Sequence, residues 1–236
     1  MSHGQTDIVL PVHNALEYTQ ACIDSVFANT NHFRLILVDD FSQPDTTAYL
    51  LSTLLRQPES LYIRSAQQKW FTRASNLGLR MVRTQRCVLL NSDCVVANGW
   101  LEELYDVWAE AQAVLGTKRV GLVGSTQSAE EPRRWAESAE PGYVTGHCFL
   151  LSMPVLYEVS EKRGQPGWYL DEINRDAIHI NSDRYLNYEL NRLGYATIAS
   201  MKAAVGHHGG KSWGYNLGLT SRLRIGDPEK GEVLNS

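Results

Sequence analysis

The sequence predicts an α/β protein with a mostly parallel central sheet and helices on both faces. Two observations predict this class. Short apolar runs alternate with longer amphipathic stretches through the first half of the chain, which is typical of parallel strands joined by right-handed helical crossovers. Several runs are apolar at nearly every position, as expected for strands that are buried on both faces. With 236 residues, 43% of them apolar, the chain can bury about 70–75% of its unfolded surface around one core.

The first half of the chain alternates predicted strands and helices in strict order. Between the strands, apolar residues recur at helical spacing. We expect Asp45 to cap the second helix, because Asp is a preferred N-cap residue and Pro58 lies just beyond the helix end. The predicted strands are Asp7–Val12, Arg34–Val38, Leu61–Arg64, Arg86–Leu90 and Val120–Val123. The predicted helices are Ala15–Asn29, Asp45–Leu55, Phe71–Arg83 and Trp100–Leu115.

In the second half this regularity ends. A polar stretch leads to a predicted strand, Val144–Leu151. The segment Arg163–Asp176 is rich in glycine, proline and aromatic residues and is predicted to be a loop. A helix is predicted over Asn181–Leu193, with Gly194 as its C-cap, and a small strand follows at Ala196–Ala199.

Composition and charge exclude several function classes. The 22 Lys and Arg residues against 26 Asp and Glu give a formal net charge of −4, so the whole protein has no field that attracts a polyanion such as DNA. No run approaches the ~18 apolar residues of a membrane-spanning helix, and the N-terminus lacks the features of a secretory signal. The four cysteines show no CxxC spacing, which predicts free, mostly buried thiols and a cytoplasmic protein.

Polar residues follow three of the predicted strands, and open parallel sheets bind ligands beyond the carboxyl ends of their strands. The three positions are Val12-His13-Asn14, Asp39-Asp40 and Asn91-Ser92-Asp93. Carboxylates there can accept hydrogen bonds from a ribose or a base, and they can bind a hard divalent cation that neutralises phosphates. The sequence has no GxGxxG after the first strand, no GxxxxGKS or GxxxxGKT, and no GxSxG. A Rossmann dinucleotide site, a P-loop and a serine hydrolase are therefore disfavoured.

Six segments stand in an order that is specific as a set: IVLPVHNALEYTQACIDSVFANT, LILVDDFSQPDT, NLGLRMVRTQRCVLLNSDCVV, GHCFLL, the predicted helix from Asp183 to Gly194-Tyr195, and VGHHGGKSW. Together they resemble the family 2 nucleotide-sugar glycosyltransferases, which have the Rossmann-like GT-A fold. The resemblance covers residues 6–215. It implies a single domain over residues 1–236, with a nucleotide-sugar-binding half (6–124) and an acceptor and catalytic half (125–215). The second half would form a small C-terminal acceptor-side subregion, followed by a tail (216–236).

The resemblance implies a set of nucleotide-binding positions. Asp39 and Asp40 match the acidic pair that binds the base and the ribose, and Arg73 and Asn76 match the segment that borders the sugar-nucleotide pocket. On the residues alone, the acidic pair could instead cap a turn or a helix. The matching residues are Pro11, Val12, Asn14, Asp39, Asp40, Arg73, Asn76, Asn91 and Ser92.

The resemblance also implies a divalent cation, Mn²⁺ or Mg²⁺. Asp93 is the last residue of the family's Asp-x-Asp position and would bind the cation that bridges the diphosphate. Asn91 replaces the first acid of that motif. His207, or its neighbour His208, matches the C-terminal histidine that completes the metal site or contacts the diphosphate. The two histidines could also lie on the surface beside a glycine turn.

In inverting members of this family, a general base takes the proton of the acceptor hydroxyl as that hydroxyl attacks the anomeric carbon. Asp183 stands in the second place of the family's Glu-Asp pair and is the implied base, although Ser182 replaces the Glu. Asp171 or Glu172 on the preceding loop is the alternative base. Outside the family context, Asp183 could merely stabilise a helix dipole from the first turn.

We therefore expect a metal-dependent, inverting glycosyltransferase that moves a sugar from a UDP-, dTDP- or GDP-linked donor to a hydroxyl acceptor. The acceptor could be a glycan, a lipid-linked glycan, a protein or a modified nucleobase. The alternative is a catalytically silent GT-A-like module that binds a nucleotide or a glycan, which the replacements Asn91 and Ser182 keep open. A nucleotidyltransferase is disfavoured, because no glycine-rich basic loop follows the first strand.

Overall fold

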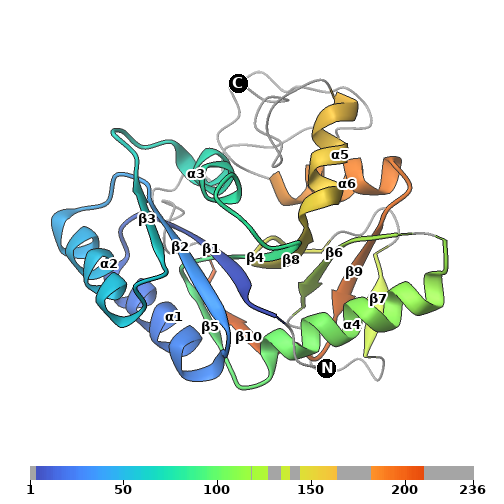
Figure 1. Cartoon of the computed structure of the whole chain (residues 1–236), viewed down its shortest axis with the longest axis horizontal. Coiled ribbons are helices and arrows are strands. Elements are labelled where there is room, and N and C mark those ends of the chain that lie inside the picture. Colours follow the sequence, from blue (N-terminus) through green and yellow to red (C-terminus); the bar gives the residue numbers. More distant parts are fainter. Residues whose placement is uncertain (1–3, 118, 127–133, 139–143, 164–181, 210–236) are drawn as a thin grey trace.

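The computed structural model describes residues 4–117, 119–126, 134–138, 144–163 and 182–209. In this part of the chain, a large eight-stranded sheet forms the centre and a separate two-stranded sheet lies beside it (Figure 1). The strands of the large sheet are β1 (Thr6–Val12), β2 (Phe33–Asp39), β3 (Leu61–Arg64), β4 (Arg86–Leu90), β6 (Val120–Ser125), β7 (Trp135–Glu137), β8 (Cys148–Ser152) and β9 (Ala196–Ser200). The small sheet consists of β5 (Cys94–Val96) and β10 (Val205–His207). The helices are α1 (Leu16–Asn29), α2 (Pro44–Arg56), α3 (Trp70–Leu79), α4 (Trp100–Leu115), α5 (Met153–Arg163) and α6 (Ser182–Arg192).

The large sheet has the strand order β3-β2-β1-β4-β8-β6-β9-β7. Its first four strands are parallel, so Val9 of β1 lies between Ile36 of β2 and Leu89 of β4. β8 runs antiparallel to both β4 and β6, β6 is parallel to β9, and β7 is antiparallel at the edge. The predicted α/β class with a mostly parallel sheet is confirmed.

Helices cover both faces of the large sheet, and each face has its own apolar layer (Figure 1). α1, α2 and α4 pack on one face, against alternate strand residues such as Ile8 and Leu10. α3, α5 and α6 pack on the other face, against the intervening residue Val9. Every residue of β1 and β2 is therefore buried, which is the physical reason that these strands are apolar at nearly every position.

α3 lies close against β1 and β2, because Gly78 faces the sheet without a side chain. A Cβ atom at Gly78 would lie 2.4 Å from Val9 Cγ1 and 2.9 Å from Val38 Cγ2. Glycine allows this approach of the helix backbone to the strands. The contact fixes the height of α3 above the two strands whose ends carry the candidate site.

Three predicted boundaries are wrong, two of them at the start of an element. The second helix begins at Pro44 with Gln43 as its N-cap, so Asp45 lies in the first turn and does not cap the helix. Proline is well suited to this first position, because its fixed φ matches the helix and its missing N–H has no partner there. The strand predicted from Val144 begins only at Cys148, because the residues before it connect to α6 instead of pairing in the sheet.

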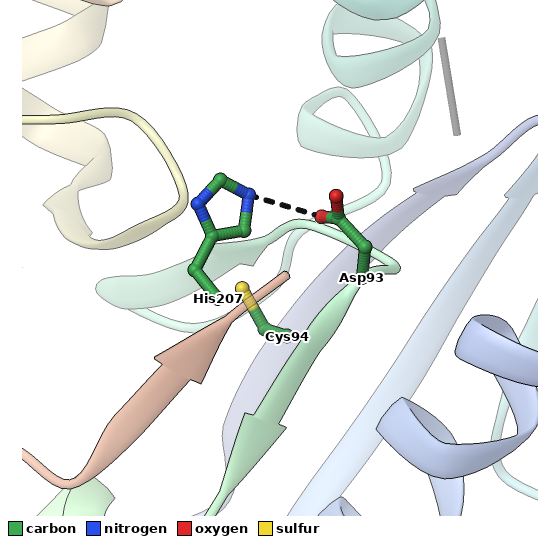
Figure 2. A group of neighbouring side chains, drawn as sticks. All are labelled: Asp93, Cys94 and His207. Atoms are coloured by element: carbon green, nitrogen blue, oxygen red, sulfur yellow. Dashed lines mark ion pairs between the residues drawn. The ribbon is translucent and has the colours of Figure 1, made fainter. Parts of the chain in front are cut away.

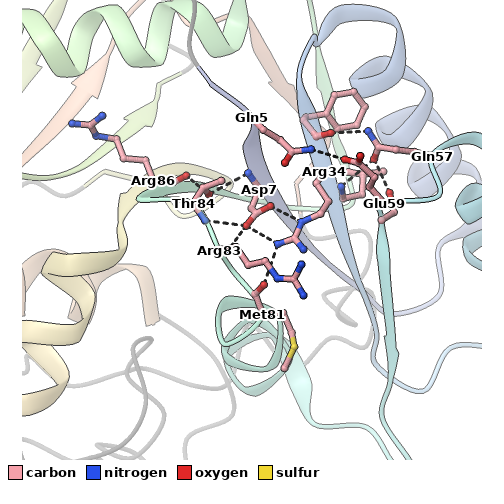
Figure 3. A network of polar contacts seen from close by, with 12 residues as sticks. Gln5, Asp7, Arg34, Gln57, Glu59, Met81, Arg83, Thr84 and Arg86 are labelled. Atoms are coloured by element: carbon pink, nitrogen blue, oxygen red, sulfur yellow. Dashed lines mark hydrogen bonds and ion pairs between the residues drawn. The ribbon is translucent and has the colours of Figure 1, made fainter.

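The third helix ends at Leu79 rather than at Arg83, because the segment after it is bound to a buried ion pair at the start of the sheet (Figure 3). Arg34 donates two hydrogen bonds to Asp7, of 2.7 and 2.8 Å, and a third to the Met81 carbonyl (3.1 Å). The Arg83 amide donates to the same Asp7 carboxylate (2.6 Å). The pair thus connects the amino ends of β1 and β2 to the chain between α3 and β4.

Four elements were not predicted: the three-residue strands β5, β7 and β10, and helix α5. α6 agrees with the predicted helix over its described residues, and Gly194 follows it with a φ of 82°, which confirms the predicted C-cap. All four cysteines are buried and free, as predicted. None of the described helices is both long and apolar enough to cross a bilayer.

Candidate active site

The three polar strand ends meet at one edge of the large sheet. β2, β1 and β4 are parallel neighbours, so their carboxyl ends bring Asp39-Asp40, Val12-His13-Asn14 and Asn91-Ser92-Asp93 to the same edge. Hydrogen bonds connect the loops after β1 and β2. The Asn14 amide donates to Ser42 Oγ (3.0 Å), and Asn14 Oδ1 accepts from Gln43 N (2.7 Å). Asn14 has a φ of 57°, a left-handed conformation that Asn adopts more readily than most residues.

Asp39 is a buried carboxylate held by four donors. Its oxygens accept hydrogen bonds from Ser42 N (2.8 Å), Thr47 Oγ1 (2.7 Å) and Tyr62 OH (2.7 Å). The guanidinium of Arg64 is the fourth donor. Burial acts to raise the pKa of Asp39, but the hydrogen bonds outweigh it and hold the pKa below its ordinary value. Asp39 is therefore ionised at neutral pH.

Asp40 binds backbone amides instead of the side chains that surround Asp39. Its two carboxylate oxygens accept hydrogen bonds from Lys69 N (2.7 Å) and Trp70 N (2.8 Å) at the start of α3. Burial raises the pKa of Asp40 despite these amide donors. Trp70 has a φ of 68°, which is uncommon for a bulky residue. Both Asp40 oxygens thus serve the N-terminus of α3, which is the helix-capping interpretation that the sequence left open.

The remaining residues predicted to border the nucleotide differ in exposure. Arg73 on α3 is exposed, whereas Asn76, one turn later, is 2% exposed. Pro11 and Val12 are buried within β1. Arg73 is therefore the residue of these four that presents its polar group to solvent, while the other three shape the edge of the sheet.

The turn after β4 meets β10 through the small two-stranded sheet. In that antiparallel pair His207 lies opposite Cys94, and the Asp93 carbonyl accepts a hydrogen bond from His208 N (3.0 Å). Asp93 Oδ1 lies 3.1 Å from His207 Nε2. Figure 2 shows these two side chains pointing toward each other, with Cys94 beside them. One ligand atom each from Asp93, Cys94 and His207 lies within 4.8 Å of the others.

Asp93, Cys94 and His207 form a candidate metal cluster, and together with the nearby Asn91 they fit a divalent cation. Asn91 Oδ1 is buried and has no hydrogen-bond partner among the described residues, while Asn91 Nδ2 lies 3.5 Å from His207 Nε2. A buried acceptor without a partner costs about 1–3 kcal/mol, and a cation would supply that partner. Carboxylate, amide and imidazole groups are established ligands of divalent cations. The ring of His208 lies outside the cluster and packs edge-on against Tyr18, with 5.2 Å between centroids.

His147 supports the ring of His207. The two imidazoles are stacked, with 4.9 Å between their centroids and 11° between their planes. His147 Nε2 lies 2.6 Å from Ser125 Oγ, and Nδ1 lies 3.0 Å from Thr145 Oγ1. Burial, together with the neighbouring His207, lowers the pKa of His147 to about 4, so the ring is neutral at pH 7. The sequence does not predict His147 as a metal ligand, since a lone histidine on the predicted strand Val144–Leu151 is more typical of a packed or acceptor-side residue.

Asp183 lies in the first turn of α6 and connects this helix to the segment before β8. Its Oδ2 accepts a hydrogen bond from Gly146 N (2.9 Å), and its Oδ1 accepts one from Arg184 N (2.9 Å). Asn187, one turn later, exchanges two hydrogen bonds of 3.1 Å with the backbone of Val144. Burial raises the pKa of Asp183 despite its amide donors. The Asp183 carboxylate thus contacts Gly146, which directly precedes His147, the residue stacked on His207.

Comparison with known proteins identifies the family of this chain. The family model described as Glycosyl transferase family 2 matches residues 7–158. The chain belongs to glycosyltransferase family 2. In this family 2 chain the matched segment includes Asp39, Asp40 and Asp93, whereas Asp183 and His207 lie beyond its end.

Two known proteins are similar to the family 2 chain. It is 22% identical over 158 residues to "Glycosyltransferase GlyG" of Streptococcus pneumoniae serotype 4 (strain ATCC BAA-334 / TIGR4). The aligned region covers 66% of this chain and 49% of that relative. Its structure is similar to that of the mannosyltransferase PcManGT from Pyrobaculum calidifontis in complex with GDP-Man and Mn²⁺. That match has a TM-score of 0.62 and 16% sequence identity, and it covers 86% of this chain and 56% of the other. The family 2 chain thus spans about half the length of each relative, and the structural likeness establishes the GT-A fold.

The structure places the residues expected to bind the donor and the metal in one region of the family 2 chain. Asp93 and His207 are in direct contact, at the same sheet edge as the positions predicted to bind the nucleotide. Asp183 reaches that region through the backbone before β8. The alternative bases Asp171 and Glu172 lie outside the described residues.

Proposed function

We propose that this family 2 chain is a metal-dependent glycosyltransferase that moves a sugar from a nucleoside diphosphate donor to a hydroxyl acceptor. The observation that carries the proposal is that Asp39 and Asp93 lie at the carboxyl ends of β2 and β4, on either side of β1 in one sheet, and that His207 of β10 contacts Asp93. One edge of the sheet thus offers a carboxylate for a nucleoside and a cluster for a cation, and a nucleoside diphosphate needs both. The similar mannosyltransferase in complex with GDP-Man and Mn²⁺ supports this use of the fold.

The nucleoside would bind over Asp39. Of the four groups that donate to this carboxylate, Arg64 is exposed, so a nucleoside hydroxyl or base N–H displaces Arg64 at the least cost. GDP is the first nucleotide to test, because the structural neighbour binds GDP-Man, with UDP and dTDP as the other candidates. The residues proposed to surround the nucleotide are Pro11, Val12, Asn14, Asp40, Arg73, Asn76, Asn91 and Ser92.

Asp93 and His207 would hold Mn²⁺ or Mg²⁺, with Asn91 Oδ1 as an additional oxygen ligand. When bound, the cation supplies Lewis-acid neutralisation of the departing diphosphate. His147 stacks against His207 and so keeps the imidazole in one orientation, as groups behind metal ligands commonly do.

Asp183 is the proposed general base of an inverting transfer. The acceptor oxygen forms a bond to the anomeric carbon while the bond between that carbon and the diphosphate oxygen breaks, and the hydroxyl proton passes to Asp183. Each carboxylate oxygen can accept about two hydrogen bonds, so the amide bonds to Asp183 leave room for the acceptor proton. A pKa raised by burial suits a group that takes up a proton near neutral pH. Asp171 and Glu172 are the alternative bases.

The proposal includes the whole chain, residues 1–236, as one domain with a donor half and an acceptor half. Its acceptor is a hydroxyl of a glycan, a lipid-linked glycan, a protein or a modified nucleobase. We propose a cytoplasmic location, because four free buried thiols suit a reducing compartment.

Calorimetric titration with GDP, UDP and dTDP, with and without Mn²⁺, tests the proposed donor and metal. We expect one nucleotide to bind tightly only when Mn²⁺ is present. Asp93→Asn should weaken the Mn²⁺-dependent binding at least about tenfold, since even groups behind metal ligands contribute that much. Asp45→Asn, which changes an exposed carboxylate on α2, is the matched control. Metal-independent binding without any glycosyl product would indicate a catalytically silent nucleotide-binding module instead.

Substitution of Asp183 tests the proposed base. Asp183→Asn keeps an oxygen for the Gly146 amide, so we expect the donor Kd to be unchanged while kcat falls by about 10²–10⁴-fold. Wild-type kcat should fall as the pH drops through a carboxyl pKa that lies above the ordinary 3.8, because only the ionised carboxylate accepts a proton. Asp106→Asn on α4 is the control. Full turnover of Asp183→Asn, with the loss appearing in Asp171→Asn or Glu172→Gln, would move the base to the preceding loop.

A further inference from the structure

Cys94 brings a thiol into the candidate metal cluster. It is the first residue of β5, is fully buried, and lies opposite His207 in the antiparallel pair of β5 and β10. Directly opposed residues of such a pair project from the same face. Cys94 Sγ accordingly lies within 4.8 Å of a carboxylate oxygen of Asp93 and a ring nitrogen of His207 (Figure 2).

Asp93, Cys94 and His207 offer oxygen, sulfur and nitrogen ligands, whereas a site for a hard cation has mainly oxygen ligands. Oxygen ligands suit Mg²⁺ and Mn²⁺, whereas a thiolate favours Zn²⁺ and other softer cations. Cysteine, histidine and carboxylate are all zinc ligands, and zinc sites use three or four of them. Cys94 Sγ donates to the His147 carbonyl at 3.4 Å, and a thiol is only a weak donor, so the hydrogen bond that Cys94 gives up on binding a metal is a weak one.

We propose that Cys94, Asp93 and His207 form a zinc site, and that Zn²⁺ bound there inhibits transfer by excluding the Mn²⁺ or Mg²⁺ of the reaction. This regulation rests on the proposed function of the same cluster. On binding, the S–H bond of Cys94 breaks, a sulfur–zinc bond forms and the proton leaves to solvent, with no change in any oxidation state.

Two contacts hold His207 and Asp93 in place before a metal binds, and strand pairing places Cys94 opposite His207. The His207 ring is stacked on His147, and the Asp93 side chain is 3% exposed with its backbone carbonyl bonded to His208 N. Three ordered protein ligands need no nucleotide to complete a zinc site. A hard cation held by Asp93 and His207 gains further oxygen ligands from a diphosphate. Zinc binding should therefore be independent of nucleotide, whereas Mn²⁺ binding should require it.

Cobalt spectroscopy and zinc calorimetry on the full chain test the proposal. Co²⁺ is added to the wild type, to Cys94→Ser and to Cys87→Ser, all without nucleotide. Cys87 is the matched control, because it is equally buried but contacts Met153 Sδ (3.6 Å) on the other face of the sheet. We expect a sulfur-to-cobalt charge-transfer band in the wild type and Cys87→Ser, and none in Cys94→Ser. The Zn²⁺ affinity of Cys94→Ser should fall by at least about 10–100-fold, the cost of disturbing even an outer group of a metal site.

The outcomes separate this inference from the proposed function. A charge-transfer band that survives in Cys94→Ser, or zinc affinity that does not change, overturns the role of Cys94. If the wild type binds Zn²⁺ but shows no charge-transfer band with Co²⁺, the metal has only oxygen and nitrogen ligands. This result also overturns the role of Cys94 and leaves the transferase proposal intact. If Mn²⁺ and nucleotides fail to bind but the cobalt band appears as expected, the transferase proposal fails and the zinc site stands. Cys94→Ala, checked by thermal unfolding, replaces Cys94→Ser if the serine variant does not fold.

Discussion

His147 shows how burial fixes the chemical state of a single side chain beside the candidate metal site. It is 5% exposed, and each ring nitrogen has a hydroxyl partner, Ser125 on one side and Thr145 on the other. A neutral imidazole donates from one nitrogen and accepts at the other, and a hydroxyl can match either role. The neutral ring is therefore fully satisfied, whereas a buried charge would have to form beside His207.

We predict that the free energy of unfolding falls as the pH drops from 6.5 to 4, because of His147. The unfolded histidine binds a proton near its ordinary pKa of 6.5, whereas the folded one does so only near 4. The contribution to stability is therefore complete above pH 6.5 and falls as the pH drops toward 4, by about 3 kcal/mol for this one group. Chemical denaturation at pH 7 and pH 4.5 measures the loss, which should be smaller in His147→Gln.

The matched control is His32→Asn. His32 is exposed and has a φ of 54°, a conformation that Asn tolerates, so this variant should keep the wild-type pH dependence. If His147→Gln kept it as well, other groups would be responsible for the acid instability.

At the scale of secondary-structure elements, the buried pair of Asp7 and Arg34 connects β1 and β2 to the chain after α3 (Figure 3). We predict that Arg34→Met lowers the free energy of unfolding by about 3–5 kcal/mol, because it leaves a buried carboxylate without its cation. Asp7→Asn/Arg34→Met should cost less, because asparagine carries no charge and still offers an oxygen to the Arg83 amide. Denaturant titration of the three proteins at pH 7 measures both effects.

An exposed ion pair provides the comparison for this prediction. Arg56 on α2 and Asp24 on α1 form a pair whose side chains are 41% and 59% exposed. Such pairs contribute about 1 kcal/mol or less, so Arg56→Met should have a much smaller effect than Arg34→Met. Equal losses in the two variants would show that burial does not determine the strength of the Asp7–Arg34 pair.

Local sequence patterns predict the longer elements other than α5 and fail for the three-residue strands. α4 runs over Trp100–Leu115 as predicted, because an apolar stripe repeated over four turns is an unambiguous signal. Three residues cannot show a period, so β5, β7 and β10 gave none. Their existence depends on pairing between segments far apart in the sequence, as between Cys94 and His207.

Only part of the candidate site can be predicted from the sequence. Asp39 and Asp93 can be, because ligands of open parallel sheets bind at strand ends. The attachment of Asp40 to the first amides of α3 depends on how that helix packs on the sheet. The stacking of His147 on His207 depends on the end of β10 meeting the residue before β8 in space. No local pattern encodes either contact.

At the scale of the whole molecule, the candidate site lies where the parallel part of the large sheet meets its mixed part. The parallel strands β2, β1 and β4 supply Asp39 and the turn with Asp93. The antiparallel strand β8 follows His147, whose carbonyl accepts a hydrogen bond from Asn91 N (2.9 Å). The Asp7–Arg34 pair lies at the opposite, amino ends of β1 and β2, so substitutions there should change stability while leaving the metal cluster in place.

The proposed function requires one edge of the sheet to hold a nucleoside through Asp39 and the cation of its diphosphate through Asp93 and His207. A crystal structure with Mn²⁺ and the nucleoside diphosphate that binds best, with anomalous data collected at the manganese edge, is the decisive test. We predict one manganese peak bonded to Asp93 and His207, with the nucleoside in contact with Asp39. A peak bound by other residues, with the nucleoside away from Asp39, would contradict the proposed function.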